Sequence, residues 1–246
     1  MPMFDKLKKF FLRDTASDKA YNRWSADYDN QPDNLMLALD EEIVGKMLEE
    51  ISLEGKIIAD IGCGTGRHWK KLFGRKPLRL LGYDVSAGML KMLQQKFPEA
   101  ETHLIHDDHL QGLKDHYCDF ILSTLTVAHI NNLENALQEW DRVLKPGAGI
   151  LISDFHPDLL AKGGKRTFRK DGELISIKNY IHSIDKIKNI AGQLGWHTVR
   201  FIERKVDEEV KHFYEKQNAL RVYEKFFGEP VIYAIYLIKA DVASTG

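Results

Sequence analysis

Short apolar runs alternate with helical segments between residues 56 and 155, and this alternation restricts the fold more than any other feature of the sequence. The apolar runs cover residues 56–62, 78–85, 101–108, 118–127 and 147–155, and helical periodicity covers 67–73, 87–97 and 133–144. Strands connected by helices of this length predict a parallel sheet with right-handed crossovers and helices on both faces.

Beyond residue 155 the pattern changes and predicts a mixed sheet. A hairpin is expected over residues 167–177, around the Asp171-Gly172 turn. It is followed by predicted elements at 184–194 (helix), 197–206 (strand), 207–227 (long helix) and 231–240 (strand). Two strands separated by a helix indicate an edge arrangement. We therefore predict an α/β fold with a doubly wound, seven-stranded sheet, an antiparallel last strand and a hairpin inserted after the fifth strand.

The charges of the chain nearly balance. Its 35 Lys and Arg residues oppose 36 Asp and Glu residues, so the formal net charge is −1. This balance lacks the basic surface typical of nucleic-acid binding, and no nucleic-acid partner is expected. Cys63 and Cys118 form no Cys-x-x-Cys pair, which argues against a disulfide framework or a cysteine zinc site. We expect a cytoplasmic protein.

The N-terminal residues 3–12 carry Phe4, Leu7, Phe10 and Phe11 at helical spacing, with lysines between them. A basic amphipathic helix of this kind either rests on a membrane surface or packs on its own domain. It lacks the continuous apolar stretch of a secretion signal. No run in the chain approaches the roughly 18 apolar residues of a membrane span. No stable membrane insertion is expected.

The glycine-rich stretch from Asp60 to Gly66, DIGCGTG, lies between the first predicted strand and the first predicted helix. Glycines at such a junction let the backbone approach a ligand, and the amides of the following helix can hold an anion. Asp84 ends the second predicted strand, twenty positions after Gly64. This is the spacing at which a carboxylate accepts hydrogen bonds from ribose hydroxyls. The two features indicate a nucleoside-containing cofactor.

Two cofactor types compete for such a site, and the residues favour one of them. The spacing is G-x-G-x-G, whereas the dinucleotide fingerprint G-x-G-x-x-G would need a glycine where Arg67 stands. Asp60 would repel the diphosphate of NAD or FAD but would attract the ammonium group of S-adenosylmethionine. Asp107 and Asp108, which follow the third strand, can accept from an adenine amino group, although a polar loop can also begin in this way.

Five segments resemble the class I S-adenosylmethionine-dependent methyltransferases, of the small-molecule, quinone-biosynthesis type. They are ADIGCGTGRH, LLGYDVSAGML, HDDHL, YCDFILSTLTVAHI and VLKPGAGILISDFHP. The segment YNRWSADYD resembles the aromatic stretch that often lies over the cofactor in these enzymes. The resemblance implies a Rossmann-like fold, S-adenosylmethionine as cofactor and S-adenosylhomocysteine as product. It implies cofactor contacts from Tyr28, Asp60, Gly62, Cys63, Gly64, Asp84, Val85, Met89, Asp107, Asp108, Ser123 and Thr124.

With this resemblance the chain is interpreted as a single methyltransferase domain over residues 1–246. Residues 1–52 form a helical cap segment and residues 53–157 the cofactor-binding core. The insertions at 158–183 and 208–228 lie on the substrate side and are expected to choose the methyl acceptor.

Methyl transfer from a sulfonium is a direct displacement, so no covalent catalytic residue is needed. A hydroxyl or carbon acceptor would need a general base. His156, after the fifth strand, is the preferred candidate for that base. His129, after the fourth strand, is the second candidate, with lining of the pocket as its alternative role.

A metal site is not predicted, although His103, His106 and His109 stand close to Asp107 and Asp108. Residues three apart on a strand point to opposite faces of the sheet, which separates His103 from His106.

Aromatic residues of the cap segment and of the hairpin region have two interpretations. Tyr21, Trp24, Phe168 and Tyr180 either bind a planar substrate as a lid or form a secondary core. The basic residues between 162 and 170 fit either an anionic substrate or a solvated face.

The sequence thus predicts a methyltransferase acting on O, N or C of a small aromatic or planar metabolite. The alternatives are a non-catalytic S-adenosylmethionine-binding protein and a nucleic-acid methyltransferase. The balanced charge and the sequence Ser123-Thr124-Leu125-Thr126, which lacks an Asn/Asp-Pro-Pro-aromatic motif, argue against the latter.

Overall fold

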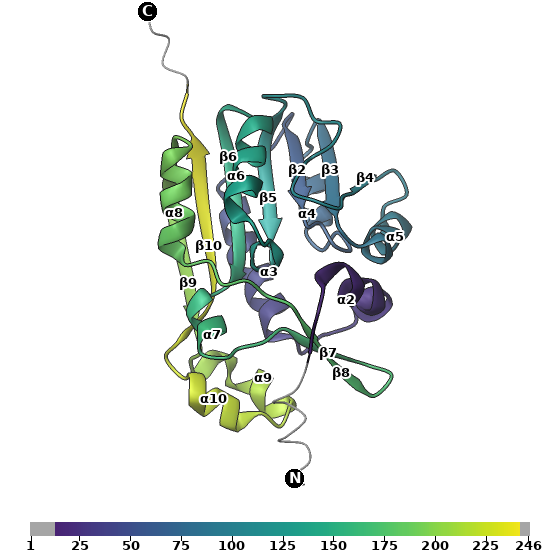
Figure 1. The fold of residues 1–246 in the computed structure, drawn as a ribbon, viewed down its shortest axis with the longest axis vertical. Coiled ribbons are helices and arrows are strands. Elements are labelled where there is room, and N and C mark those ends of the chain that lie inside the picture. The colour runs from purple at the N-terminus through teal and green to yellow at the C-terminus, as the bar shows by residue number, and fades with distance from the viewer. Residues whose placement is uncertain (1–12, 242–246) are drawn as a thin grey trace, which may run out of the picture.

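A computed structural model describes residues 13–241 of the 246-residue chain, with a seven-stranded sheet at its centre (Figure 1). The strand order is β4-β3-β2-β5-β6-β10-β9. In chain order the strands are β2 (Ile57–Ile61), β3 (Arg79–Asp84), β4 (Glu101–Leu104), β5 (Cys118–Thr124), β6 (Leu144–Phe155), β9 (Trp196–Lys205) and β10 (Pro230–Lys239). Strands β2 to β6 pair in parallel, and β10 runs antiparallel between β6 and β9. The predicted mixed, doubly wound α/β sheet is confirmed.

Helices cover both faces of this sheet. The helices α3 (Leu35–Glu49), α4 (Trp69–Gly74) and α5 (Ala87–Lys96) pack on one face. The helices α6 (Leu133–Val143) and α8 (Ile184–Gln193) pack on the other. Side chains alternate between the faces along each strand, so Phe120 and Leu122 enter the first core while Ile121 enters the second.

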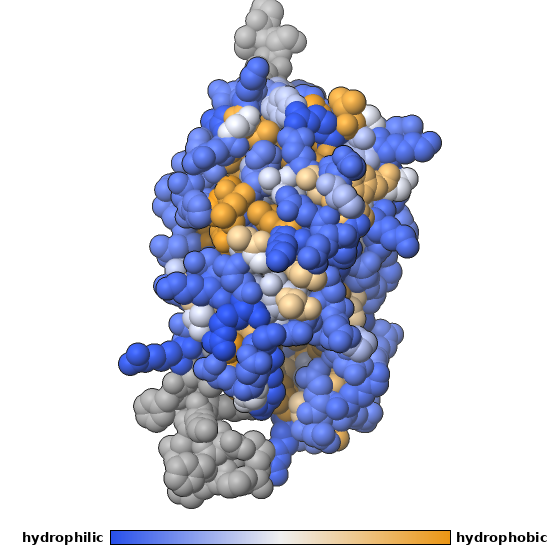
Figure 2. Space-filling model, turned by 90° about the vertical axis from the view of Figure 1, so that its right-hand side faces the viewer, coloured by the Kyte–Doolittle hydropathy of each residue, from blue (hydrophilic) through white to orange (hydrophobic). Residues whose placement is uncertain are grey.

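Hydrophilic side chains dominate the face seen in Figure 2, with smaller apolar patches between them.

The remaining elements gather beyond the carboxyl ends of the parallel strands, in the lower half of Figure 1. They are β1 (Asp14–Thr15), α2 (Ser17–Trp24), α7 (Pro157–Ala161), β7 (Thr167–Lys170), β8 (Glu173–Ile177), α9 (Lys211–Lys216) and α10 (Leu220–Phe226). The predicted hairpin is β7 and β8, and β1 adds to it as a parallel partner of β8. The cap segment and the insertions therefore meet at the edge where open α/β folds bind ligands.

Two predicted elements need correction, and one falls outside the described residues. The single helix predicted over 207–227 is divided into a 3-10 turn (Glu208–Val210), α9 and α10, with Asn218 in a left-handed conformation (φ 52°) after α9. The third strand ends at Leu104, and residues 105–108 form a loop. The helix predicted over residues 3–12 lies outside the described range. Among the helices of residues 13–241, none combines the length and apolar character that crossing a bilayer requires.

A buried ionic cluster joins α3 to the loop before α4 and to β6. Asp40 is fully buried, and its carboxylate accepts hydrogen bonds from Arg67, from His68 Nε2 (2.9 Å) and from Ser153 Oγ. Burial alone would raise the pKa of Asp40, but Arg67 and His68 hold that pKa below its usual range. The cluster therefore fixes the cap segment to the sheet. Because Asp40 is buried, water cannot take the place of its hydrogen-bond partners if one of them is lost.

We expect Asp40→Asn to lower the free energy of unfolding by about 3–5 kcal/mol, because it leaves Arg67 without its buried counter-charge. Glu42→Gln, on the same helix, removes an exposed pair with Lys46 and a longer one with Arg204 (4.0 Å), and it should cost at most about 1 kcal/mol. Urea titration measures both changes. Similar losses in the two variants would contradict the role given to Asp40.

Candidate functional site

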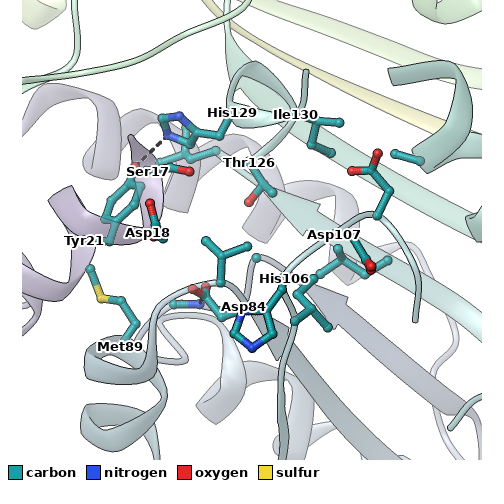
Figure 3. Close-up of a pocket in the computed structure, with 18 of the residues that line it drawn as sticks. Ser17, Asp18, Tyr21, Asp84, Met89, His106, Asp107, Thr126, His129 and Ile130 are labelled. Atoms are coloured by element: carbon teal, nitrogen blue, oxygen red, sulfur yellow. Dashed lines mark hydrogen bonds between the residues drawn. The ribbon is translucent and has the colours of Figure 1, made fainter. Parts of the chain in front are cut away.

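A cavity of about 330 Å³, here called the first cavity, opens at the carboxyl ends of β2, β3 and β5 (Figure 3). The glycine loop after β2 and the ends of the neighbouring strands form its floor. The helix α2 contributes Ser17, Asp18 and Tyr21 from the opposite side. Of the residues predicted to contact a cofactor, those that line it are Tyr28, Gly62, Gly64, Asp84, Val85, Met89, Asp107, Asp108 and Thr124.

The glycine loop can turn here only because Gly62 and Gly64 lack a side chain. Both have positive φ, 72° and 54°, which other residues rarely adopt. A Cβ atom on Gly62 would lie 2.0 Å from Thr126 Oγ1. The loop after β2 and the loop after β5 are therefore in direct contact, and the backbone of the first is exposed to the cavity.

Asp84, at the end of β3, organises this loop. Its carboxylate accepts hydrogen bonds from the amides of Gly64 (2.8 Å) and Ser86 (2.8 Å). Burial raises the pKa of Asp84 to about 6, and the backbone donors oppose this rise. An ionised carboxylate that lines this cavity has lone pairs suited to hydroxyl groups of a ligand.

Three residues predicted to contact the cofactor lie beneath the loop and do not line the first cavity. Asp60 accepts a hydrogen bond from Trp69 Nε1 (2.8 Å), and burial raises its pKa to about 7. Cys63 is buried in the core under the loop. Ser123 donates its hydroxyl to the carbonyl of Ile61 (3.0 Å). The predicted contact of Asp60 with an ammonium group stays a prediction.

The cap segment is held over the first cavity by hydrogen bonds that sequence reasoning did not foresee. Asn22 Oδ1 accepts from the amide of Gly88 (2.7 Å) and the hydroxyl of Ser86 (2.9 Å). Asp29 accepts from Thr65 in the glycine loop (2.6 Å). Isolated polar residues carry no signal for such contacts, because the partners are more than thirty positions away in the chain.

A second cavity, of about 590 Å³, adjoins the first and shares Tyr21, Tyr28 and Leu125 with it. Its other walls come from residues 31–37 and from the two predicted substrate-side insertions, including Leu159, Arg166, Tyr214 and Phe226. Leu125 has a left-handed backbone (φ 54°), unusual for a leucine, and its amide donates to the carbonyl of Ser153 (2.7 Å). A constrained turn thus separates the two cavities.

His129 lies at this boundary, and its hydrogen bonds define its protonation. Its Nδ1 lies 3.0 Å from the carbonyl of Lys178, and its Nε2 lies 2.8 Å from the hydroxyl of Tyr21. Burial and the charge of Arg166 hold the pKa of His129 well below 6.5. The neutral ring therefore donates from Nδ1 and accepts at Nε2. It lines the first cavity, but it is a weak base.

Arg166 is buried and paired, which its sequence context does not predict. It was one of several basic residues assigned to an anionic substrate or a solvated face, yet only 5% of its side chain is exposed. It pairs with the buried Asp154 and donates to the carbonyl of Leu125 and to His129 Nε2 (2.7 Å). The one signal in the sequence is its place just before β7, two residues from the buried Phe168, which continues the two-residue period of that strand.

His156, the preferred candidate base, lies away from both cavities. Its Nε2 donates to Glu203 (2.8 Å) and its Nδ1 accepts from the amide of Asp158 (3.2 Å), which caps α7. Tyr180 also lies outside the two cavities. Because His156 is engaged on both nitrogens, its geometry supports a structural role.

The predicted aromatic lid is divided between two roles. Trp24 and Phe168 stack with ring centroids 4.4 Å apart, inside a small core with residues of α2 and β8. Tyr21 and Tyr28 pack against this core and line both cavities. The secondary core accounts for Phe168, while Trp24 also reaches the second cavity.

The candidate metal ligands do not converge. Within residues 13–241, no three His, Cys, Asp or Glu side chains are grouped in a way that would hold a metal ion.

Comparison with known proteins points to one family. Residues 59–152 match the model of a methyltransferase domain. A malonyl-[acyl-carrier protein] O-methyltransferase of Yersinia pestis is 34% identical over 122 residues, which cover 48% of this chain and 44% of the relative. A malonyl-[acyl-carrier protein] O-methyltransferase of Serratia marcescens is 30% identical over 159 residues, which cover 64% of this chain and 60% of the relative. Residues 59–152 are thus similar to a methyltransferase domain, and S-adenosylmethionine is the cofactor that the motifs and the fold of the chain indicate.

Solved structures share the fold of the methyltransferase domain. A putative S-adenosylmethionine-dependent methyltransferase from Listeria monocytogenes has a TM-score of 0.65 at 18% identity, covering 83% of this chain and all of that chain. The [4+2]-cyclase SpnF has a TM-score of 0.68 at 15% identity, and the match covers 94% of this chain and 98% of SpnF. The chain spans about half the length of the curated relatives that it matches.

We expect the affinity for S-adenosylhomocysteine to depend on the ionisation of Asp84. The raised pKa of about 6 means that the carboxyl is protonated at lower pH, so affinity should rise with pH and level off above about pH 6. Below that pH the loss should approach about tenfold per pH unit. Calorimetry from pH 5 to 8 measures it. Asp84→Asn should bind weakly and lack this step; a step that persists in the variant would assign it to another group.

Gly62→Ala should abolish cofactor binding, because its Cβ would displace Thr126 and the loop after β5. Gly172→Ala is the matched control: its φ is also positive, 76°, but the space around it is open and it lies in the hairpin turn. Both variants carry a backbone penalty of about 1–2 kcal/mol. Equal binding of S-adenosylhomocysteine by the two variants would contradict the close-approach role of Gly62.

Proposed function

We propose that this protein transfers the methyl group of S-adenosylmethionine to a carboxylate oxygen of a small acid. The observation that carries the proposal is the meeting of two cavities at Tyr21, Tyr28 and Leu125. An acceptor in the second cavity would lie beside a cofactor in the first. Such adjacency is what a direct displacement needs, because alignment of the reacting atoms provides most of the catalysis.

The residues of the first cavity suit the cofactor. Gly62 and Gly64 allow close approach of the backbone, and the Asp84 carboxylate suits ribose hydroxyls. Asp107 and Asp108 lie in the loop after β4, where they would meet the adenine. When bound, S-adenosylmethionine supplies an electrophilic methyl group on a sulfonium and leaves as S-adenosylhomocysteine. The chain itself holds the acceptor and excludes water.

A carboxylate acceptor matches the proton chemistry of the boundary. A hydroxyl or carbon acceptor must lose a proton, and His129 is poorly suited to take it because its pKa is held well below 6.5 and its Nε2 already accepts a hydrogen bond. A carboxylic acid is already ionised at neutral pH. It therefore needs positioning rather than a base.

The names of the relatives support an oxygen acceptor on an acid. The Yersinia pestis and Serratia marcescens proteins are named malonyl-[acyl-carrier protein] O-methyltransferases. The match leaves about half of those proteins uncovered, so the proposal for this chain takes from their names only the chemical class, methylation of an oxygen on an acid.

A second candidate function is a reaction other than methyl transfer that uses the same cavities. The fold is shared by a protein named as a [4+2]-cyclase, so the fold by itself does not require methylation. This candidate predicts that the cofactor binds without being consumed.

The test is to incubate the protein with S-adenosylmethionine labelled in its methyl group and a metabolite extract enriched in organic acids. We expect a labelled product that releases methanol on treatment with alkali, because esters hydrolyse there while methyl groups on nitrogen, carbon or ether oxygen do not. An alkali-stable label would contradict the carboxylate acceptor. Binding of the cofactor with no labelled product from any extract would favour the second candidate.

A further inference from the structure

Arg166 and Tyr21 come from segments far apart in the chain and meet at Nε2 of His129, a residue that lines the first cavity. Tyr21 lies on α2, and Arg166 precedes β7 in the insertion after β6. Both line the second cavity, and both contact Nε2 of His129. The guanidinium of Arg166 also lies over the ring of Phe155, 4.1 Å from its centroid, which fixes the plane of the guanidinium.

The guanidinium has more donors than the protein uses. Nη1 faces two acceptors, Leu125 O and His129 Nε2, and Nη2 faces the Asp154 carboxylate. Nε is buried and has no hydrogen-bond partner among the described residues. The contacts with Leu125, His129 and Asp154 use three of the five N–H groups of the arginine, and the Nε–H has no acceptor among the described residues. A buried donor of a charged group left unpaired is costly, and native sites usually pair it.

A count of lone pairs shows that Tyr21 is also short of an acceptor. In the neutral ring of His129, Nδ1 carries the proton that it donates to Lys178 O, so Nε2 offers a single lone pair. Two donors approach that lone pair, the Tyr21 hydroxyl at 2.8 Å and Arg166 Nη1 at 2.7 Å. Arg166 always brings a proton, whereas the tyrosine hydroxyl can rotate. Burial raises the pKa of Tyr21, so its hydroxyl stays a donor at neutral pH.

We infer that Arg166 and Tyr21 together form an anion seat, in which the free N–H groups of the guanidinium and the rotated tyrosine hydroxyl bind the carboxylate of the acceptor. This inference rests on the proposed function, because it assigns the residues that select the acid. Asp154 and Phe155 hold the guanidinium in place, and Nε2 of His129 contacts both Arg166 and Tyr21. The planar fork of an arginine suits a carboxylate in a way that the point charge of a lysine does not.

The seat has a specificity consequence. A neutral amide of the same shape lacks the charge and cannot accept with both of its polar atoms, so it leaves donors of the seat unpaired. Hydrogen bonds to charged groups are worth about 1.5–3 kcal/mol, which corresponds to roughly tenfold to more than a hundredfold in affinity. The second cavity should therefore prefer an acid to its amide.

The experiment uses the full chain saturated with S-adenosylhomocysteine and measures binding of three acids, acetate, hexanoate and benzoate, by calorimetry, with hexanamide as the neutral comparison. We expect at least one acid to bind, and hexanoate to bind more tightly than hexanamide by about tenfold or more. Arg166→Lys and Tyr21→Phe should each lose about tenfold for the acid and nothing for the amide.

The matched control is Arg169→Gln, which removes an exposed positive charge from the same hairpin and should bind the acids as the unaltered protein does. Because Arg166 is buried against Asp154, the double variant Asp154→Asn/Arg166→Gln provides a version without an unpaired buried charge. Retained binding of S-adenosylhomocysteine shows that each variant is folded. The double variant should also lose its preference for the acid.

Three results would overturn the seat: no binding of any of the acids, equal affinity for hexanoate and hexanamide, or unchanged acid affinity in both Arg166→Lys and Tyr21→Phe. These results are separate from failure of the proposed function. If methyl transfer yields only alkali-stable products while acid binding still requires Arg166 and Tyr21, the seat stands and the carboxylate is not the reacting group. If alkali-labile product forms equally well in both variants, the function stands and the seat is wrong.

Discussion

The close contact between the loops after β2 and β5 is the constraint on which the site depends. A side chain at Gly62 would have no room beside Thr126, and Asp84 at the end of the neighbouring strand accepts a hydrogen bond from the amide of Gly64. Parallel strands deliver these loops to one edge, and the contact between them forms the floor of the first cavity. Leu125 directly precedes Thr126 in this contact, and Tyr21 of α2 closes the first cavity from the opposite side.

Buried ion pairs connect the added segments to this frame. Asp40 joins the cap segment to the glycine loop and β6, and Arg166 joins the insertion after β6 to Asp154 at the end of that strand. A buried pair is weak evidence for stability, but it fixes geometry, because either partner left alone is costly. Arg166, which lines the second cavity, is thus held by the same contact that attaches its segment to the sheet.

The sequence predicted the features that arise from local patterns. Alternation of strands and helices gave the sheet, and the spacing of Gly62, Gly64 and Asp84 placed residues that the structure finds around one cavity. It failed where long-range pairing decides. Apart from its two-residue spacing to Phe168, nothing local distinguishes the buried Arg166 from the exposed Arg169. His156 follows the end of a strand, as a base would, but Glu203 and the start of α7 engage both of its nitrogens. The break near Asn218 was also missed, because the helical pattern continues across it.

The most direct test of the account is a crystal structure of the protein with S-adenosylhomocysteine bound. We predict that the nucleoside occupies the first cavity with its ribose hydroxyls on the Asp84 carboxylate, and that its sulfur faces the boundary formed by Tyr21 and Leu125. A nucleoside bound away from Asp84, or a sulfur directed away from the second cavity, would contradict the central claim that these two cavities form one methyl-transfer site.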